Sequence, residues 1–207
     1  MRFHKPLSYI LDNRIKVDIL RFLVKTGAEW NGREIAKELK ISPAACHKAL
    51  KNLYQEGIIS LKAIGRTHLY KLNHSRLIVR NLLKPVFKYE MKSVDNLAHF
   101  INQKIKKYAS RYFISLALFG SVLTGREKPD SDIDLLVIIR HSAERQKAED
   151  LLSELGDLLA NKTGNTLSPY LQTLNEFRLK YKKRVMVIKS IADSHLLIWG
   201  KPIKDLL

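Results

Sequence analysis

Residues 118–139 read "LFGSVLTGREKPDSDIDLLVII". An apolar segment runs into Gly120 and Ser121, ten residues follow, and Asp132 and Asp134 then stand one residue apart at the start of a second apolar segment. Two like charges this close repel each other, so a purely structural segment gains nothing from the pair. The two aspartates are therefore a candidate functional site.

The segments around this motif predict alternating strands and helices. Residues 113–120 and 133–140 are apolar enough for buried strands, and a third strand is expected near 166–172. A long amphipathic helix is expected from about 143 to 161, and helical segments are expected to end in "LLIWG" at 196–200. The alternation indicates an α/β arrangement of layers with a small mixed sheet.

Asp132 and Asp134 are expected to share one face of their strand. Side chains at positions i and i+2 project to the same side, with Cα atoms roughly 6–7 Å apart. Alone, the two carboxylates would raise each other's pKa, whereas a divalent cation between them makes their closeness favourable. Mg²⁺ suits such a site, because it takes a few carboxylates and completes its shell with water and phosphate oxygens. The alternative is that the pair merely caps or solvates the strand end.

The Gly-Ser turn before the aspartates suits a phosphate. Gly120 lets a phosphate approach the backbone, and Ser121 offers a hydroxyl and exposed amides. A strand, Gly-Ser, ten residues and Asp-Ile-Asp resemble the signature of the DNA polymerase β-like nucleotidyltransferase superfamily, particularly its minimal prokaryotic members. The resemblance implies that Gly120 and Ser121 hold a nucleoside triphosphate. It also implies that Asp132 and Asp134 are the catalytic pair and carry Mg²⁺ or Mn²⁺.

Active members of that superfamily usually add a third carboxylate on a neighbouring strand. The strand expected near 166–172 offers no side chain that is ionised at neutral pH, only Ser168, Tyr170 and Gln172. Glu176 could substitute only if the following loop bends back, and Asp130 is expected to shape its turn. Arg126 and Lys128 face either phosphates or water. The sequence therefore leaves catalysis open.

Residues 1–74 predict three helices and a hairpin. Residues 15–25 repeat apolar side chains at helical spacing, Asn31 starts a capping box, and Ser42 with Pro43 starts a third helix that ends near Gly57. The third helix is expected to bury Ala45, Ala49, Leu50 and Leu53, and to turn outward Ala44, His47, Lys48, Lys51 and Asn52.

Two apolar segments, 58–64 and 67–73, enclose Gly65 and Arg66 and predict the hairpin. Three helices followed by a hairpin resemble the winged helix-turn-helix of bacterial and archaeal transcription regulators. In that fold the third helix enters the major groove of double-stranded DNA, and the hairpin tip lies along the backbone or the minor groove. The resemblance implies six DNA contacts: His47, Lys48 and Lys51 from the helix, and Lys62, Arg66 and His68 from the wing. The alternatives are a solvated lysine face and a histidine without a special role.

Residues 75–92 form a helical connector, in which Pro85 is expected to end or kink a helix near Leu83. Winged-helix regulators commonly dimerise through helices that flank the wing, so this segment is either a homodimer interface or packed on its own domain. Residues 93–207 form the nucleotidyltransferase-like domain, which begins with a helix at 93–109.

Composition supports a polyanionic partner. The 207 residues carry a formal charge of +17, and residues 1–90 hold 18 Lys or Arg against 7 Asp or Glu. Each phosphate neutralised by Lys or Arg releases condensed counterions. Cys46 is the only cysteine, which excludes an internal disulfide; a buried side chain is expected there rather than a redox sensor. We expect a cytoplasmic protein with no membrane partner, because neither a signal peptide nor an apolar span of about 18 residues is present.

Three functions follow. The first is a DNA-binding transcriptional regulator whose second domain binds a metal and a nucleotide. The second is an active nucleotidyltransferase that moves NMP, typically AMP, from NTP to a hydroxyl of a protein or nucleic-acid acceptor. The third, an RNA-modifying polymerase, has the least support, because the sequence contains no further RNA-binding unit. The predicted fold class is α+β in every case.

Overall fold

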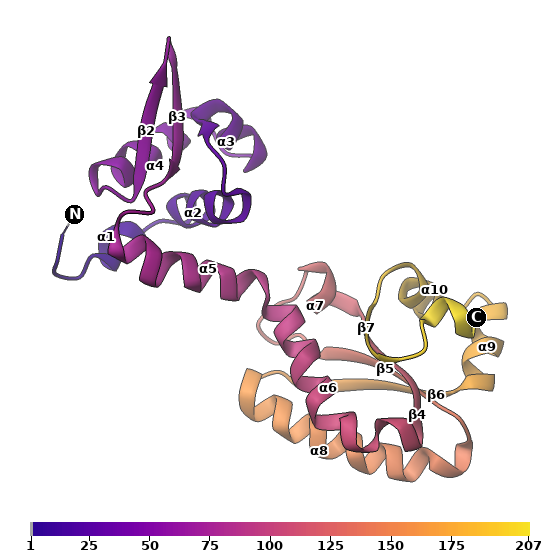
Figure 1. The fold of residues 1–207 in the computed structure, drawn as a ribbon. Helices are drawn as coiled ribbons and strands as arrows, with labels where there is room; N and C mark the ends of the chain where they lie inside the picture. The colour runs from indigo at the N-terminus through magenta and orange to yellow at the C-terminus, as the bar shows by residue number, and fades with distance from the viewer. Residues whose placement is uncertain (1) are drawn as a thin grey trace. The chain divides into compact units, whose positions relative to one another are not determined.

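A computed structural model describes residues 2–207, apart from the side chains of residues 109 and 110. The chain divides into two compact units, Met1–Lys92 and Ser93–Leu207, each with a hydrophobic core of its own. Helices and strands build both units (Figure 1), which confirms the predicted α+β class.

Capping residues start the helices of the first unit. Asn13 accepts a hydrogen bond from the backbone N–H of Ile15 at 2.8 Å. Asn31 forms the predicted capping box with Glu34, and Ser42 accepts from the N–H of Ala45 at 3.2 Å. Such side chains satisfy N–H groups that have no partner within the helix. The helices are α1 (Leu7–Ile10), α2 (Arg14–Thr26), α3 (Gly32–Glu38) and α4 (Pro43–Gln55).

A β-hairpin follows the helices of the first unit. Strands β2 (Ile59–Ile64) and β3 (Thr67–Leu72) are antiparallel, and Gly65 in the turn between them has φ +58°, a conformation that favours glycine. The short strand β1 (Trp30–Asn31) pairs with β3, so the sheet order is β1-β3-β2. The hairpin extends well beyond the helices of this unit (Figure 1). The arrangement confirms the predicted winged-helix architecture.

The segment 75–92 packs on its own unit. It consists of a π-helical turn, η1 (Val79–Leu83), followed by α5 (Lys84–Met91). Pro85 lies in the first turn of α5, and the irregular turn ends at Leu83, where the sequence predicts a break. The buried side chains Val79, Leu83 and Phe87 join the core formed by α2, α4 and the hairpin. Arg21 of α2 holds the end of α5 through two hydrogen bonds of 2.8 Å to the Glu90 carboxylate.

A four-stranded sheet organises the second unit, in the order β6-β5-β4-β7. The central pair β4 and β5 is antiparallel, β5 and β6 are parallel, and β7 is antiparallel to β4. The elements are α6 (Ser93–Tyr112), β4 (Phe113–Leu118), α7 (Gly120–Thr124), β5 (Ile133–Ile139), η2 (Ser142–Glu144), α8 (Arg145–Thr163), β6 (Leu167–Thr173), α9 (Leu174–Lys182), α10 (Met186–Asp193), β7 (Leu196–Gly200) and η3 (Ile203–Leu206).

Helices cover both faces of this sheet (Figure 1), which explains why β5 is apolar without a break from Leu135 to Ile139. Leu135 and Val137 face α6 and α8, whereas Leu136 and Ile138 face α9, α10 and η3. Asp134 precedes Leu135, so it shares the face of Leu136 and Ile138. The alternation places this aspartate on the face of the sheet that α9 and α10 cover.

The sequence prediction is wrong at residues 196–200, because "LLIWG" forms strand β7 and not the end of a helix. The segment pairs antiparallel with β4, and Gly200 (φ +90°) lies so close to the Ile114 carbonyl that a Cβ would overlap it. Pairing with a strand about 80 residues earlier decides this structure, and a local pattern does not contain that information. Within the described part of the chain, no helix has the length and apolarity needed to cross a membrane.

Candidate functional site

Gly120 and Asp134, separated by 13 residues, are in contact in the second unit. Strand β4 leads into Phe119, whose N–H donates to the Asp134 carbonyl at 3.1 Å, and Gly120 then begins α7. Gly120 has φ +81°, and a Cβ at this position would overlap Oδ2 of Asp134. A glycine is therefore required here for two reasons, the left-handed backbone and the space that the carboxylate occupies. Ser121 follows in the first turn of α7 and is half-buried.

The two aspartates differ in environment. Asp132 is exposed at the mouth of β5, whereas Asp134 is half-buried. Burial raises the pKa of Asp134, and the neighbouring Asp132 carboxylate raises that pKa further. A bound cation would remove this repulsion, and oxygen ligands from two carboxylates suit Mg²⁺ or Mn²⁺. The residues thus fit a cation held by two protein ligands; among residues 2–207 no cluster of three acidic, histidine or cysteine side chains adds more.

Two residues that sequence reasoning missed support the aspartate loop. The Asn165 side-chain amide donates to the carbonyls of Pro129 and Ser131, at 3.2 and 2.9 Å. The Thr166 hydroxyl donates to the Asp132 carboxylate, and its carbonyl accepts from Ile133 N–H at 2.8 Å. A polar Asn-Thr pair directly before an apolar strand is the only signal that the sequence offers. These contacts hold the loop that carries the paired acids.

The strand register decides which residue stands beside Asp134. Ser168 of β6 pairs with Asp134, and Tyr170 pairs with Leu136 two positions further along. Paired residues of parallel strands project to the same face, so the position expected for a third acid holds a serine hydroxyl. Tyr170 is engaged with α9, because Lys180 Nζ donates to its hydroxyl at 3.2 Å.

Glu176 lies at the other end of the sheet. Its helix starts after Thr173, which pairs with Ile139, five residues beyond the Asp134 level and therefore roughly 16 Å away. The Glu176 carboxylate accepts from Thr173 N–H at 2.7 Å and from Arg145 Nη2 at 2.8 Å. The Thr173 hydrogen bonds and the Arg145 charge lower the pKa of Glu176, with the backbone bond contributing most. The chain does not bend back, and Glu176 has a structural role.

The loop before the aspartates is exposed. Arg126, Lys128 and Asp130 all face solvent, and Ser131 shapes the turn by accepting from Lys128 N–H at 2.8 Å. Both cations stay available to an incoming anion. Asp130 lies in this exposed turn and does not belong to the pair of Asp132 and Asp134, as the sequence predicts.

In the first unit, the predicted exposed face of α4 is present except at Asn52, which is half-buried. His47, Lys48 and Lys51 are exposed, and the ion pairs of this unit join other lysines and arginines. The opposite face of α4 packs into the core through Cys46, Ala49, Leu50 and Leu53. Burial raises the pKa of the Cys46 thiol to about 11, which keeps the thiol protonated and confirms a packing role. Ala45, expected in the buried stripe, is only half-buried.

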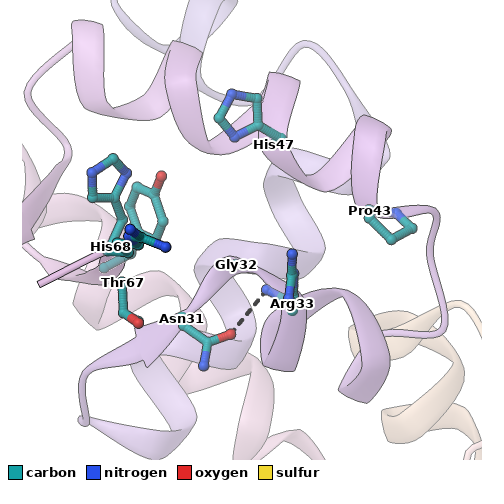
Figure 2. A pocket seen from close by; sticks show the side chains of 9 residues that line it. Asn31, Gly32, Arg33, Pro43, His47, Thr67 and His68 are labelled. Atoms are coloured by element: carbon teal, nitrogen blue, oxygen red, sulfur yellow. Dashed lines mark hydrogen bonds between the residues drawn. The ribbon is translucent and has the colours of Figure 1, made fainter.

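A pocket of about 550 Å³ separates α4 from the hairpin (Figure 2). His47 reaches it from α4, Arg66 and His68 reach it from the hairpin, and Arg33 reaches it from α3. Asn31 lies at one side, where its Oδ1 accepts from Arg33 N–H at 3.0 Å. Three predicted DNA-contacting residues, His47, Arg66 and His68, thus meet in one place. Arg33 joins them, although the sequence pattern did not single it out.

Lys62, a predicted DNA contact of the wing, does not line the pocket. It pairs with Leu69 on the hairpin, whereas His68 pairs with Ala63, so the two side chains project to opposite faces. Lys62 also lies near Glu29, whose pKa is lowered first by its hydrogen bond to Lys71 and then by the charges of both lysines. The exposed Lys62 therefore belongs to the far face of the wing and not to the pocket.

Comparison with known families identifies both units. The family model "Winged helix-turn-helix DNA-binding" matches residues 12–60, and the family model "Polymerase beta, Nucleotidyltransferase" matches residues 103–193. The second match includes the Gly-Ser turn, both aspartates and the serine beside them. The chain therefore combines a winged helix-turn-helix domain with a nucleotidyltransferase domain of the polymerase β type. No curated protein matches the chain.

Several solved structures are similar to the chain. HlyU from Vibrio cholerae N16961 is 20% identical with a TM-score of 0.36, over 40% of this chain and 86% of that one. NolR from Sinorhizobium fredii is 21% identical with a TM-score of 0.35, over 42% and 80%. The homodimeric winged helix-turn-helix domain of Mb0332 from Mycobacterium bovis, a possible ArsR-family regulator, is 18% identical with a TM-score of 0.35, over 42% and 77%. Each alignment covers less than half of this chain.

Proposed function

We propose that the protein is a cytoplasmic DNA-binding transcriptional regulator whose second domain holds Mg²⁺ or Mn²⁺ and a nucleoside triphosphate. The observation that carries the proposal is the exposed basic face of α4, with His47, Lys48 and Lys51 beside a pocket lined by two arginines. A helix that is well packed on one side and basic on the other suits the major groove of double-stranded DNA.

The positive charge of this face predicts that DNA binding depends on salt concentration. Lys48 and Lys51 are exposed and can reach phosphates, and each phosphate contact releases about 0.9 counterion. Affinity for DNA should therefore fall steeply with salt. The protein's net charge of +17 adds long-range attraction to any polyanion.

In the second domain, Asp132 and Asp134 would hold the cation, and Gly120 and Ser121 would hold the phosphates. A divalent cation supplies charge that neutralises phosphate oxygens. Two contacts support this assignment: Asp134 lies against Gly120, and the Thr166 hydroxyl donates to the Asp132 carboxylate. The exposed cations Arg126 and Lys128 lie in the same loop and would meet the outer phosphates.

We place a homodimer interface on α5. Its buried side carries Phe87, which packs in the core beside Val79 and Leu83 of the preceding η1. The other side exposes Val86 by 53% and Tyr89 by 71%. Large apolar side chains on the outer side of a helix that is already packed favour a second copy of the chain as cover.

The test of DNA binding compares two double variants of the full chain on one duplex. Lys48→Ala with Lys51→Ala should weaken binding about 10- to 100-fold and reduce the slope of log K against log salt by about 2. Lys25→Ala with Lys147→Ala, exposed on α2 and α8, removes the same charge elsewhere and should change affinity little. Equal affinity for wild type and the α4 variant would refute the proposal. Asp132→Ala with Asp134→Ala should leave DNA binding nearly unchanged.

A second candidate is an active nucleotidyltransferase that moves NMP, AMP if ATP is the substrate, to a hydroxyl of a protein or nucleic-acid acceptor. The half-buried position of Asp134 beside Asp132 favours it, because the two carboxylates repel each other until a cation neutralises them. Ser168, which pairs with Asp134, weighs against it, because a serine hydroxyl is a poor base for the proton of the attacking hydroxyl.

Labelling distinguishes the two candidates. A panel of four α-labelled triphosphates with Mg²⁺ or Mn²⁺ should label the protein or an acceptor if the enzyme is active. The label should disappear in the double-aspartate variant and persist in Glu176→Gln. Label that survives loss of both aspartates would exclude this site as its source.

A further inference from the structure

The pocket between α4 and the hairpin brings together four basic side chains from three elements. Arg33 comes from α3, His47 from α4, and Arg66 and His68 from the hairpin. We propose that this pocket is a phosphate site that clamps one backbone phosphodiester of DNA, and that its two histidines make DNA affinity depend on pH. The inference rests on the proposed DNA-binding function, and it assigns a role to Arg33.

The lining is matched to an anion. It contains two arginines, two histidines, the Asn31 amide and the hydroxyls of Thr67 and Tyr70, and it contains no carboxylate. Figure 2 shows Arg33 and His47 on one side of the pocket and His68 and Thr67 on the other. An arginine presents five donors in a fixed fork and stays charged at every physiological pH. Two arginines on opposite walls therefore suit a group with several oxygens.

The nearby carboxylates of Glu34 and Glu29 bind other groups and do not line the pocket. Glu34, next to Arg33 in α3, accepts from Asn31 N–H at 3.2 Å as part of the capping box. Glu29 pairs with Lys71 at 2.6 Å, and Lys71 projects to the face of β3 opposite His68. Beneath the pocket, burial and the Cys46 thiol raise the pKa of Tyr70, which keeps the phenol neutral. The exposed lysine Lys48 adds positive charge from α4.

The size of the pocket favours a phosphate that belongs to a chain. At about 550 Å³ it is much larger than one phosphate ion and has room for a phosphodiester with parts of its two sugars. It also adjoins the exposed face of α4, so a duplex that receives this helix in its major groove brings its backbone to the hairpin. Phosphate contacts of this kind fix the position of a protein on DNA.

Histidine provides the pH dependence. An imidazole changes charge between pH 5 and 8, whereas the arginines do not. With His47 and His68 charged, the pocket gains two positive charges next to the phosphate. DNA affinity should therefore rise on acidification, and the slope of log K against log salt should steepen by up to about 0.9 per histidine.

The experiment measures binding of the full chain to a labelled duplex by fluorescence anisotropy at pH 5.5 and pH 8, over a range of salt. Wild type should bind about tenfold tighter at pH 5.5, and His47→Gln with His68→Gln should remove this difference. His74→Gln, an exposed histidine outside the pocket, is the matched control and should behave as wild type. Circular dichroism melting verifies that each variant is folded.

Arg33 is tested at both pH values. Arg33→Ala should weaken binding about tenfold at each pH, and Arg33→Lys should restore part of the loss, because it returns the charge without the fork. If wild type binds no duplex at any salt, the DNA-binding function itself fails. If wild type binds, but Arg33→Ala and the histidine variant match it at both pH values, only the pocket assignment is overturned.

A last arm separates a phosphate in DNA from a free phosphate. It uses the Asp132→Ala, Asp134→Ala background, so that the second domain does not bind the competitor. Inorganic phosphate or ATP at millimolar concentration should displace DNA only through ionic strength, equally with and without Arg33. Displacement at micromolar ATP that requires Arg33 would assign the pocket to a free nucleotide and overturn the DNA assignment.

Discussion

The basic face of α4 and the aspartate pair differ in how far their charges depend on the surrounding fold. Lys48 and Lys51 project from a helix whose other side packs in the core. Their charges therefore do not contribute to the stability of the fold. Asp132 and Asp134 hold like charges at one strand end, and Asp134 occupies space that only a glycine at position 120 leaves free. The first surface can be altered at little cost in stability, whereas the second is part of the fold around it.

This difference predicts that residues needed for binding lower the stability of the fold at the aspartate pair but not on the basic face of α4. Active sites often hold strained backbone and unfavourable charge pairs, which the ligand relieves. Surfaces that bind polyanions need only exposed charge on a stable support. Single substitutions can test whether the two regions follow this division. The two tryptophans, Trp30 and Trp199, report on one unit each.

Gly120→Ala should have the largest effect on stability. The new Cβ would overlap the Asp134 carboxylate, and φ +81° is unfavourable for alanine, so the second unit should lose about 2–3 kcal/mol. Gly125→Ala is the control, because φ there is +67° with open space around the Cβ, and it should lose only about 1 kcal/mol. Urea unfolding followed by Trp199 fluorescence, in a Trp30→Phe background, measures both. Equal losses would show that the carboxylate moves away freely.

Glu176→Gln should have a moderate effect and no effect on the aspartate site. The variant loses the Arg145 ion pair, which solvent screens, and part of the cap of α9, so about 1 kcal/mol is expected at pH 7. Because the folded pKa of Glu176 is lowered, this stabilisation is present above about pH 4 and is lost on further acidification. Mg²⁺ binding by calorimetry should match wild type. A lost Mg²⁺ signal would place Glu176 in the metal site after all.

Asp134→Asn should stabilise the second unit slightly when no metal is present. The folded pKa of Asp134 is raised, so its charge destabilises the fold above that pKa, and the penalty shrinks as pH falls towards the ordinary value of about 4. Solvent screening limits the gain at pH 7 to less than about 1 kcal/mol. Added Mg²⁺ should raise the melting temperature of wild type but not of the variant. A variant that is less stable than wild type at pH 7 would contradict the repulsion.

Lys48→Ala with Lys51→Ala should have the smallest effect on stability, within about 0.5 kcal/mol, because neither exposed side chain packs against the core. Unfolding of the first unit can be followed by Trp30 fluorescence in a Trp199→Phe background. If the free energy of unfolding fell by more than about 1 kcal/mol, this face would contribute to the stability of the fold, and the proposed difference from the aspartate pair would be wrong.

Much of this architecture could be predicted from local chemistry. Asn31 and Ser42 predict helix starts because their side chains accept hydrogen bonds from free backbone N–H groups. Pro43 predicts one because its fixed φ fits the first turn of a helix. The apolar runs of β4 and β5 predict buried strands. The aspartate spacing by itself places both carboxylates at one strand end, where the structure has them.

The remaining features depend on contacts between distant residues. Strand β7 exists because β4 offers it an edge, and Asn165 supports a loop that lies 34 residues earlier. Arg33 reaches the pocket only because β1 joins β3 and brings the start of α3 to the hairpin. Lys62 needed the hairpin register before its face could be assigned. No local pattern contains this information.

The pairing of Ser168 with Asp134 has an evolutionary consequence. A Ser168→Asp exchange would set a third carboxylate next to the first two without moving any strand, and the reverse exchange would remove one just as simply. In a lineage with this fold, one codon would then separate a domain that only binds a nucleotide, as we propose for this chain, from a domain that transfers it. Selection can therefore convert one into the other while the DNA-binding half of the chain stays as it is.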